Sequence, residues 1–264
     1  MAAGGFFKKL RILFLLFVLL LVAGDYWLTK YRSTNWSHSL RIVVYPINGD
    51  GSEAADQYIA QLTQDTFTPV EVFLASEAAD YGVPLEKPVI TTLGPQIQEL
   101  PPIPPADRKV LKVMWWSLKM RYWVFRVDEY QGPPADIRMF VVYHDPETHD
   151  RLQHSLGLEK GLIGVVNAYA GKKLEHKNNI VLVHEFLHTV GATDKYDLQT
   201  GAPLYPDGIV EPDKQPLYPQ SYAEIMAGVI PVADGTWLMP DKLDDTIIGR
   251  KTAFEINWIS QQQE

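Results

Sequence analysis

The chain has 264 residues, of which 46% are hydrophobic and 21% charged, a balance typical of a folded protein with one large domain or two small ones. Its formal net charge of −8 argues against nucleic acid as a partner, because phosphate binding needs a basic surface. The absence of cysteine excludes disulfides, thiolate metal sites and cysteine nucleophiles, so any metal site would use His, Asp, Glu and water.

The amino terminus predicts export. Lys8, Lys9 and Arg11 precede an uncharged apolar run at 12–24, which is the order of an export signal. Residues 1–28 are expected to be a retained signal anchor, with the body of the protein outside the cytoplasm in the periplasm or at the cell surface. A cleaved signal peptide, which would give a secreted protein, and a buried soluble helix are the alternatives.

Residues 29–39 resemble a short polar stalk, and 40–264 are expected to form one α/β domain. The β-branched run at 41–47 predicts a strand, and a turn with an amphipathic helix follows at 49–64. A second strand is expected at 69–75, which would complete a βαβ unit with a parallel pair.

The middle of the chain is rich in proline and aromatic residues. Residues 84–107 contain PPIPP at 101–105 and predict a rigid ordered loop, with a proline-recognition segment as the alternative. A helix is expected to begin at Asp107, and 121–127 to form a strand. Core positions are predicted for the aromatic residues Trp115, Trp116, Tyr122 and Trp123.

The strands expected at 135–145 and 161–171 precede a long helix. That helix carries an apolar stripe along NNIVLVHEFLHTVG, and either Asn178 or Asn179 can act as its N-cap. After Gly191 the chain is predicted to be loop-rich, with a short closing helix near 241–260.

The stretch HEFLHTVGATD at 184–194 carries the chemistry. His184 and His188 lie four apart, so on a helix both imidazoles face the same side and can bind one metal ion. Glu185 points beside that ion, where it can take a proton from water and return it to a leaving amine. A catalytic zinc needs a third protein ligand and an open position. Gly191 can adopt positive φ and end the helix, so that Asp194 can turn back as that ligand.

The pattern H-E-x-x-H-x-x-G-x-x-D resembles the metzincin zinc peptidases, most of which have a third histidine where this chain has Asp194. An aspartate followed by x-Tyr is similar to the snapalysin and immune-inhibitor-A branches. The resemblance implies a zincin-like domain after an N-terminal hydrophobic helix. Its sheet would be mixed and mostly parallel, with an antiparallel edge strand and an active-site helix.

A downstream methionine fits the same family. Met226, in SYAEIMAG, resembles the methionine turn that forms an apolar floor below the metal, although an ordinary core methionine is the alternative. Many members place a tyrosine two residues later, where this chain has Gly228. Tyr196 or Tyr222 are the candidates to replace it.

The resemblance also implies an edge strand along which an extended substrate pairs. The segment GLIGVVNAYAG is the expected edge strand, and its backbone would be available for β-augmentation. The residues predicted to offer that backbone are Gly164, Val165, Val166 and Asn167.

Other polar residues are weaker candidates. Glu211 and Glu224 are alternative third ligands, and Asp197 could ligate or orient a histidine. The loop 203–220 is either a solvated surface loop or a lid that shapes the substrate site. The remaining histidines lack ligand spacing, so no second metal site is expected; they are His38, His144, His149, His154 and His176.

The sequence therefore predicts an exported zinc endopeptidase that hydrolyses peptide or protein substrates with metal-activated water. An inactive zinc-bound scaffold at the membrane is the first alternative. A membrane-tethered interaction protein that uses 101–105 and the aromatic cluster is the second. No pattern indicates a cleavage preference or an oligomeric state.

Overall fold

The computed structural model describes residues 33–107, 109–159 and 161–260, together with Lys8, 11–14, 16, 17, 20 and 24. Apart from these few positions, the segment 1–28 predicted to be a signal or anchor lies outside the described residues. Within the described parts of the chain, no helix is both long enough and apolar enough to cross a bilayer.

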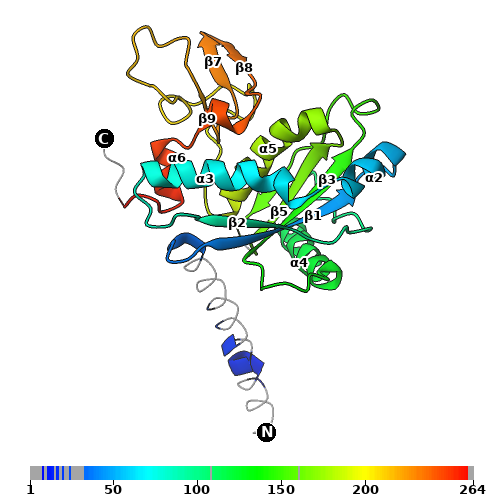
Figure 1. Ribbon diagram of the computed structural model, residues 1–264. Helices are drawn as coiled ribbons and strands as arrows, with labels where there is room; N and C mark the ends of the chain where they lie inside the picture. The colour runs from blue at the N-terminus through cyan, green and yellow to red at the C-terminus, as the bar shows by residue number, and fades with distance from the viewer. Residues whose placement is uncertain are drawn as a thin grey trace.

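A five-stranded sheet in the order β2-β1-β3-β5-β4 forms the centre of the protein (Figure 1). The first four strands in that order pair in parallel, and β4 pairs antiparallel with β5 at one edge. The strands are β1 (Leu40–Asn48), β2 (Val89–Leu93), β3 (Ile137–His144), β4 (Leu156–Leu158) and β5 (Ile163–Tyr169). The predicted mixed, mostly parallel α/β sheet is confirmed.

Both faces of the sheet are covered by helices. Alternate side chains of β1 enter two cores, with Ile42 and Val44 on one face and Val43 and Tyr45 on the other. The first face is covered by α2 (Glu53–Ala60), α3 (Thr68–Asp80) and α5 (Glu175–Thr189), and the second by α4 (Val110–Val127).

The strand predicted at 69–75 is wrong, because these residues belong to α3. Its buried side chains recur at helical spacing, as Val70, Phe73, Leu74, Glu77 and Ala78. Pro69 lies in the first turn, where its missing N–H costs no hydrogen bond. The second strand of the βαβ unit is β2, which lies inside the segment predicted to be a loop.

The strand predicted at 121–127 is also wrong, since α4 continues to Val127. Of its aromatic residues, Trp116 and Trp123 are buried as predicted. Trp115 and Tyr122 are instead 62% and 67% exposed. The helical period of the buried positions outweighs the strand propensity of the aromatic residues.

The helix α5 begins earlier than predicted. A 3₁₀ turn, Lys172–Leu174, leads directly into Glu175, and neither predicted asparagine caps the helix. The Asn178 side chain instead bonds both the backbone N–H and the carbonyl of Tyr169, at 3.1 and 2.9 Å. It therefore joins α5 to the end of β5.

The last third of the chain is loop-rich, as predicted, and packs into the same core. Trp36, which the sequence placed in a stalk, is buried against Trp258 and donates its indole N–H to the Ile256 carbonyl at 2.7 Å. The remaining elements are η1 (Gln64–Phe67), β6 (Ala223–Glu224), β7 (Ile230–Ala233), β8 (Thr236–Leu238), η3 (Leu243–Asp245), β9 (Thr246–Ile247) and α6 (Arg250–Glu255).

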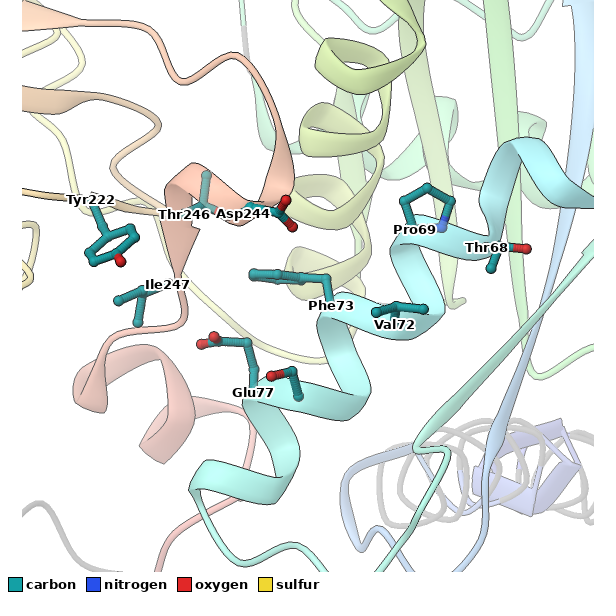
Figure 2. A pocket seen from close by; sticks show the side chains of 10 residues that line it. Thr68, Pro69, Val72, Phe73, Glu77, Tyr222, Asp244, Thr246 and Ile247 are labelled. Carbon is teal, nitrogen blue, oxygen red and sulfur yellow. The ribbon is translucent and has the colours of Figure 1, made fainter.

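A pocket of about 550 Å³ lies between α3 and this C-terminal region (Figure 2). Glu77 of α3 lines it, is largely buried, and accepts the Ile248 N–H at 2.7 Å. Burial raises the pKa of Glu77 from 4.5 to about 7, against the lowering effect of the Ile248 N–H.

The raised pKa predicts a pH-dependent stability. The folded state binds the Glu77 proton more tightly than the unfolded state, so stability declines from about pH 4.5 and levels off above about pH 7. The shift from 4.5 to about 7 corresponds to about 3 kcal/mol. Glu77→Gln should therefore be more stable than the natural protein at pH 8 and similar at pH 4.5. Denaturant unfolding at both pH values measures this, with the exposed Glu86→Gln as control; equal pH dependence in both variants would contradict it.

Candidate functional site

The helix α5 presents His184, Glu185 and His188 near its carboxyl end. The helix ends at Thr189, and Gly191 takes a φ of +109°. This conformation favours glycine, because a Cβ would be strained there. The chain then turns back, so that Asp194 reaches the two histidines.

The three side chains bring one donor atom each to a common point. The Nε2 atoms of His184 and His188 are 3.1 Å apart. Asp194 Oδ1 lies 3.2 Å from the first Nε2 and 3.0 Å from the second. A tetrahedral zinc ion with bonds of about 2.0–2.1 Å keeps its ligand atoms about 3.3 Å apart, so the spacing fits such an ion.

Backbone carbonyls fix the tautomers of both histidines. His184 Nδ1 lies 2.9 Å from the Ile225 carbonyl, and His188 Nδ1 lies 2.8 Å from the Ala192 carbonyl. A carbonyl only accepts, so each Nδ1 carries a proton, and in the neutral imidazole each Nε2 then presents a lone pair. This is the arrangement that metal-binding histidines use to fix the ring and the ligating nitrogen.

Asp194 completes an electron-rich site. Its Oδ1 is buried, and its polar neighbours are the two imidazole Nε2 atoms. Burial acts to raise the pKa of Asp194, but the two imidazoles outweigh it and hold that pKa below its usual range. Two imidazole Nε2 atoms and a carboxylate oxygen that converge in this way could hold a metal ion between them.

Glu185 lies beside this group and is only 6% exposed. Burial raises its pKa, against the lowering effects of the imidazoles and of the Gly157 N–H. Its Oε2 is buried without a hydrogen-bond partner in the described chain. A carboxylate with a raised pKa and an unsatisfied oxygen can act as a general base.

The edge strand β4 crosses directly over this part of α5. A Cβ added to Gly157 would come within 2.4 Å of the Glu185 carbonyl oxygen and 2.5 Å of His188 Cβ. Only glycine therefore allows this close approach. Gly157 could not be recognised from the sequence, because a three-residue strand gives no periodic pattern.

The predicted edge strand needs correction. Gly164, Val165, Val166 and Asn167 lie on β5, which pairs with β3 on one side and with β4 on the other. The strand at this edge of the sheet is β4. The backbone groups on its outer side have no partner strand within the sheet.

Met226 lies next to the site and is fully buried. Its neighbour Ile225 supplies the carbonyl for His184, and its own carbonyl accepts the Lys195 N–H at 3.0 Å. The turn that contains Met226 therefore contacts both the first histidine and the loop that carries Asp194.

The alternative third ligands have other roles. Both oxygens of the buried Glu224 accept hydrogen bonds, from the N–H groups of Met226, Ala227 and Gly249 and from the Thr252 hydroxyl. Glu211 pairs with Lys214 at 3.1 Å. Neither carboxylate is a member of the metal-ligand group.

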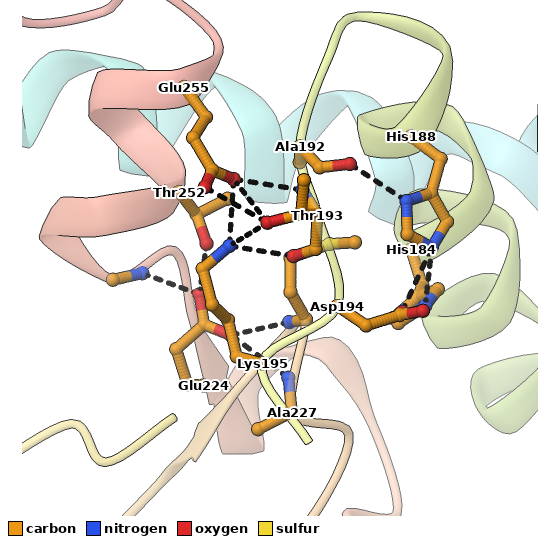
Figure 3. A network of polar contacts seen from close by, with 12 residues as sticks. His184, His188, Ala192, Thr193, Asp194, Lys195, Glu224, Ala227, Thr252 and Glu255 are labelled. Carbon is orange, nitrogen blue, oxygen red and sulfur yellow. Dashed lines mark hydrogen bonds and ion pairs between the residues drawn. The ribbon is translucent and has the colours of Figure 1, made fainter. Parts of the chain in front are cut away.

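A second carboxylate fixes the loop around Asp194 (Figure 3). Glu255 of α6 accepts the Thr193 N–H at 2.8 Å and pairs with the buried Lys195 at 2.7 Å. Lys195 Nζ also donates to the Thr193 carbonyl at 2.7 Å. Contacts from α6 thus hold both neighbours of Asp194.

Removing the Glu224 carboxylate is expected to destabilise this region strongly. Glu224→Ala leaves four donors without their acceptor, and the expected loss of unfolding free energy is about 3–5 kcal/mol. Glu224→Gln keeps the shape and one acceptor oxygen and should lose about 1–2 kcal/mol. Denaturant unfolding of both variants tests the order, and equal losses would contradict the four-bond role.

The two candidates for the missing tyrosine lie in different parts of the structure. Tyr196 lies beside Asp194 and Glu185, and burial followed by these two negative charges raises its pKa. Tyr222 instead lines the pocket against α3. Asp197 is exposed and accepts the N–H groups of Gln199 and Thr200, so it does not reach the histidines.

The loop 203–220 is ordered by its own contacts. The Gln220 side chain is buried and bonds both the N–H and the carbonyl of Glu211, at 2.7 and 3.1 Å. Leu204 donates its N–H to the Lys195 carbonyl at 2.7 Å. The loop therefore begins beside the segment that carries Asp194.

No protein-family model matches this chain, and no curated protein matches its sequence. The candidate site therefore rests on its own geometry: three ligand-type side chains that converge, and a buried carboxylate with an unsatisfied oxygen beside them.

Proposed function

We propose that this protein is a zinc-dependent endopeptidase of metzincin type. The observation that supports the proposal best is the convergence of two imidazole Nε2 atoms and one carboxylate oxygen, within 3.0–3.2 Å of one another, next to the buried Glu185. His184, His188 and Asp194 would hold the ion. Zinc bound there supplies Lewis acidity, which polarises a carbonyl and lowers the pKa of water.

Glu185 then carries the proton chemistry. Its unsatisfied Oε2 accepts the proton of the attacking water, and the same carboxyl group delivers a proton to the leaving amine. The raised pKa favours the second step, because the protonated acid forms readily in a buried site.

Peptide is the substrate class that the edge of the sheet suits. An extended chain can pair with the outer backbone of β4, and Gly157 holds this strand against α5. A peptide added there would pass close to Glu185. Tyr196, beside Asp194, is the candidate to donate a hydrogen bond to the developing oxyanion.

We also propose export, with a membrane anchor or a cleaved signal at residues 1–28. The support is the order of charges and apolar residues in the sequence. The catalytic domain would then act outside the cytoplasm.

Cleavage of a mixed peptide library by the purified full chain tests the enzymatic proposal. We expect hydrolysis that a chelator abolishes and that added zinc restores. Elemental analysis of the same sample should find bound zinc. A protein that binds zinc and leaves every peptide intact would contradict the enzymatic role.

That result would support the second candidate, a zinc-bound scaffold. The specific observation in its favour is Gly228, which stands where many metzincin peptidases carry a tyrosine and adopts a φ of +71°.

A further inference from the structure

Three polar side chains gather at the carboxyl end of the parallel strands, apart from the group on α5. They are Asp50 after β1, His144 at the end of β3, and His149 in the loop that follows β3. One ligand-type atom from each lies within 4.8 Å of the other two. The ends of parallel strands are common ligand positions.

Strand register explains how distant residues meet there. Asn48 lies opposite Tyr143 in the parallel β1–β3 pair, so the next residues of both strands leave the sheet together. Gly49 leaves room for His144, since a Cβ at that position would come within 2.6 Å of the imidazole Cε1. The sequence spacing of the histidines shows none of this.

His144 has a fixed tautomer with an unsatisfied nitrogen. Asn167 donates its amide N–H to the His154 carbonyl at 3.2 Å, which turns its Oδ1 toward His144 Nε2 at 3.2 Å. That nitrogen must therefore carry the proton. The opposite nitrogen, Nδ1, is buried and has no hydrogen-bond partner within the described residues. A buried lone pair without a partner is costly unless a ligand satisfies it.

Asp50 and His149 supply the other two donors. The Asp50 carboxylate is fixed by the N–H groups of Ser52 and Asp145, at 2.9 and 2.7 Å. His149 Nδ1 lies 3.4 Å from Asp50 Oδ2, and the two imidazole centroids are 5.2 Å apart. His149 Nδ1 also lies 2.9 Å from the Thr148 hydroxyl, so binding would require this partly exposed side chain to shift toward the ion.

We propose that Asp50, His144 and His149 form a second metal site, which binds a divalent transition-metal ion such as zinc. Imidazole nitrogen and carboxylate oxygen are suitable ligands for such an ion, and solvent can complete the shell. Bound there, the ion joins the loop that leads from β3 to β4 to the end of β1. The site stands independently of the endopeptidase proposal.

The number of zinc ions bound per chain distinguishes the second site from the site on α5. Equilibrium dialysis of the full-length protein in detergent, at buffered free zinc, should give two equivalents for the natural chain. His149→Ala and His188→Ala should each leave one, and the double variant none. The matched control His154→Ala, in the same loop, should keep two. Asp50→Asn should also leave one, and its amide oxygen keeps one of the two backbone N–H bonds that the carboxylate accepts.

The outcomes are distinct for the two proposals. If His149→Ala and Asp50→Asn bind as much zinc as the natural chain, the second site is overturned, and the contact is only an Asp50–His149 ion pair. If His188→Ala alone leaves the stoichiometry unchanged, the site on α5 fails and the second site stands.

A second measurement does not depend on counting ions. In the His188→Ala background, zinc should raise the melting temperature and protect the loop 145–155 from proteolysis. Both effects should disappear in His188→Ala/His149→Ala. Their persistence there would also overturn the second site.

Discussion

Glu185→Gln is expected to reduce peptide hydrolysis by about 10²–10⁴-fold, the usual contribution of a positioned general acid–base group. Glutamine has the same shape, and its amide oxygen can still face the Gly157 N–H. It cannot take up the proton of the attacking water. Steady-state cleavage of one library-derived peptide, at saturating zinc, measures the loss.

Zinc binding distinguishes this result from misfolding. Glu185 donates no ligand atom to the group formed by His184, His188 and Asp194, so the variant should bind zinc within about threefold of the natural protein. The exposed Glu53→Gln serves as matched control and should keep full activity. A Glu185→Gln protein with full hydrolytic activity and bound zinc would show that another group is the base.

Asp194→Ala is expected to weaken zinc binding at the α5 site by at least about 100-fold, because it leaves two protein ligands where a catalytic zinc uses three. Asp194→His restores a third ligand and should restore most of the affinity. It also makes the site one charge more positive, which should strengthen the Lewis acidity of the bound metal.

Zinc titration in a His149→Ala background isolates this site from the second one. Asp197→Ala is the control, because Asp197 lies three residues further along and caps the turn at Thr200. Unchanged affinity in Asp194→Ala would exclude Asp194 as a ligand. An equal loss in Asp197→Ala would mean that the loop, rather than the Asp194 carboxylate, determines binding.

The elements with a clean hydrophobic period were predictable from the sequence. The strands β1, β3 and β5 and the helix α2 lie where the pattern put them. The errors at 69–75 and 121–127 share one cause. In both segments β-branched and aromatic residues suggested strands, while the buried positions follow the helical period.

The side chains of the candidate site could be predicted from the sequence, but the backbone groups that orient them could not. Sequence spacing is enough to bring His184, His188 and Asp194 together, because all three lie within one helix and its following turn. The groups that orient them are the carbonyls of Ile225 and Ala192, which no side-chain pattern reveals. The cluster at Asp50 required the β1–β3 register, a long-range property that the local sequence does not encode.

The carbonyl that orients His184 belongs to a residue 41 positions later, and the carboxylate that holds Thr193 comes 62 positions later. During synthesis, His184 therefore leaves the ribosome well before the carbonyl that orients it, whereas the Ala192 carbonyl that orients His188 follows only four residues later. A chain that ends before α6 carries the whole motif but lacks the Glu255 carboxylate that holds Thr193 and Lys195, the two neighbours of Asp194. The position of Asp194 is therefore expected to become fixed late in synthesis, when α6 docks.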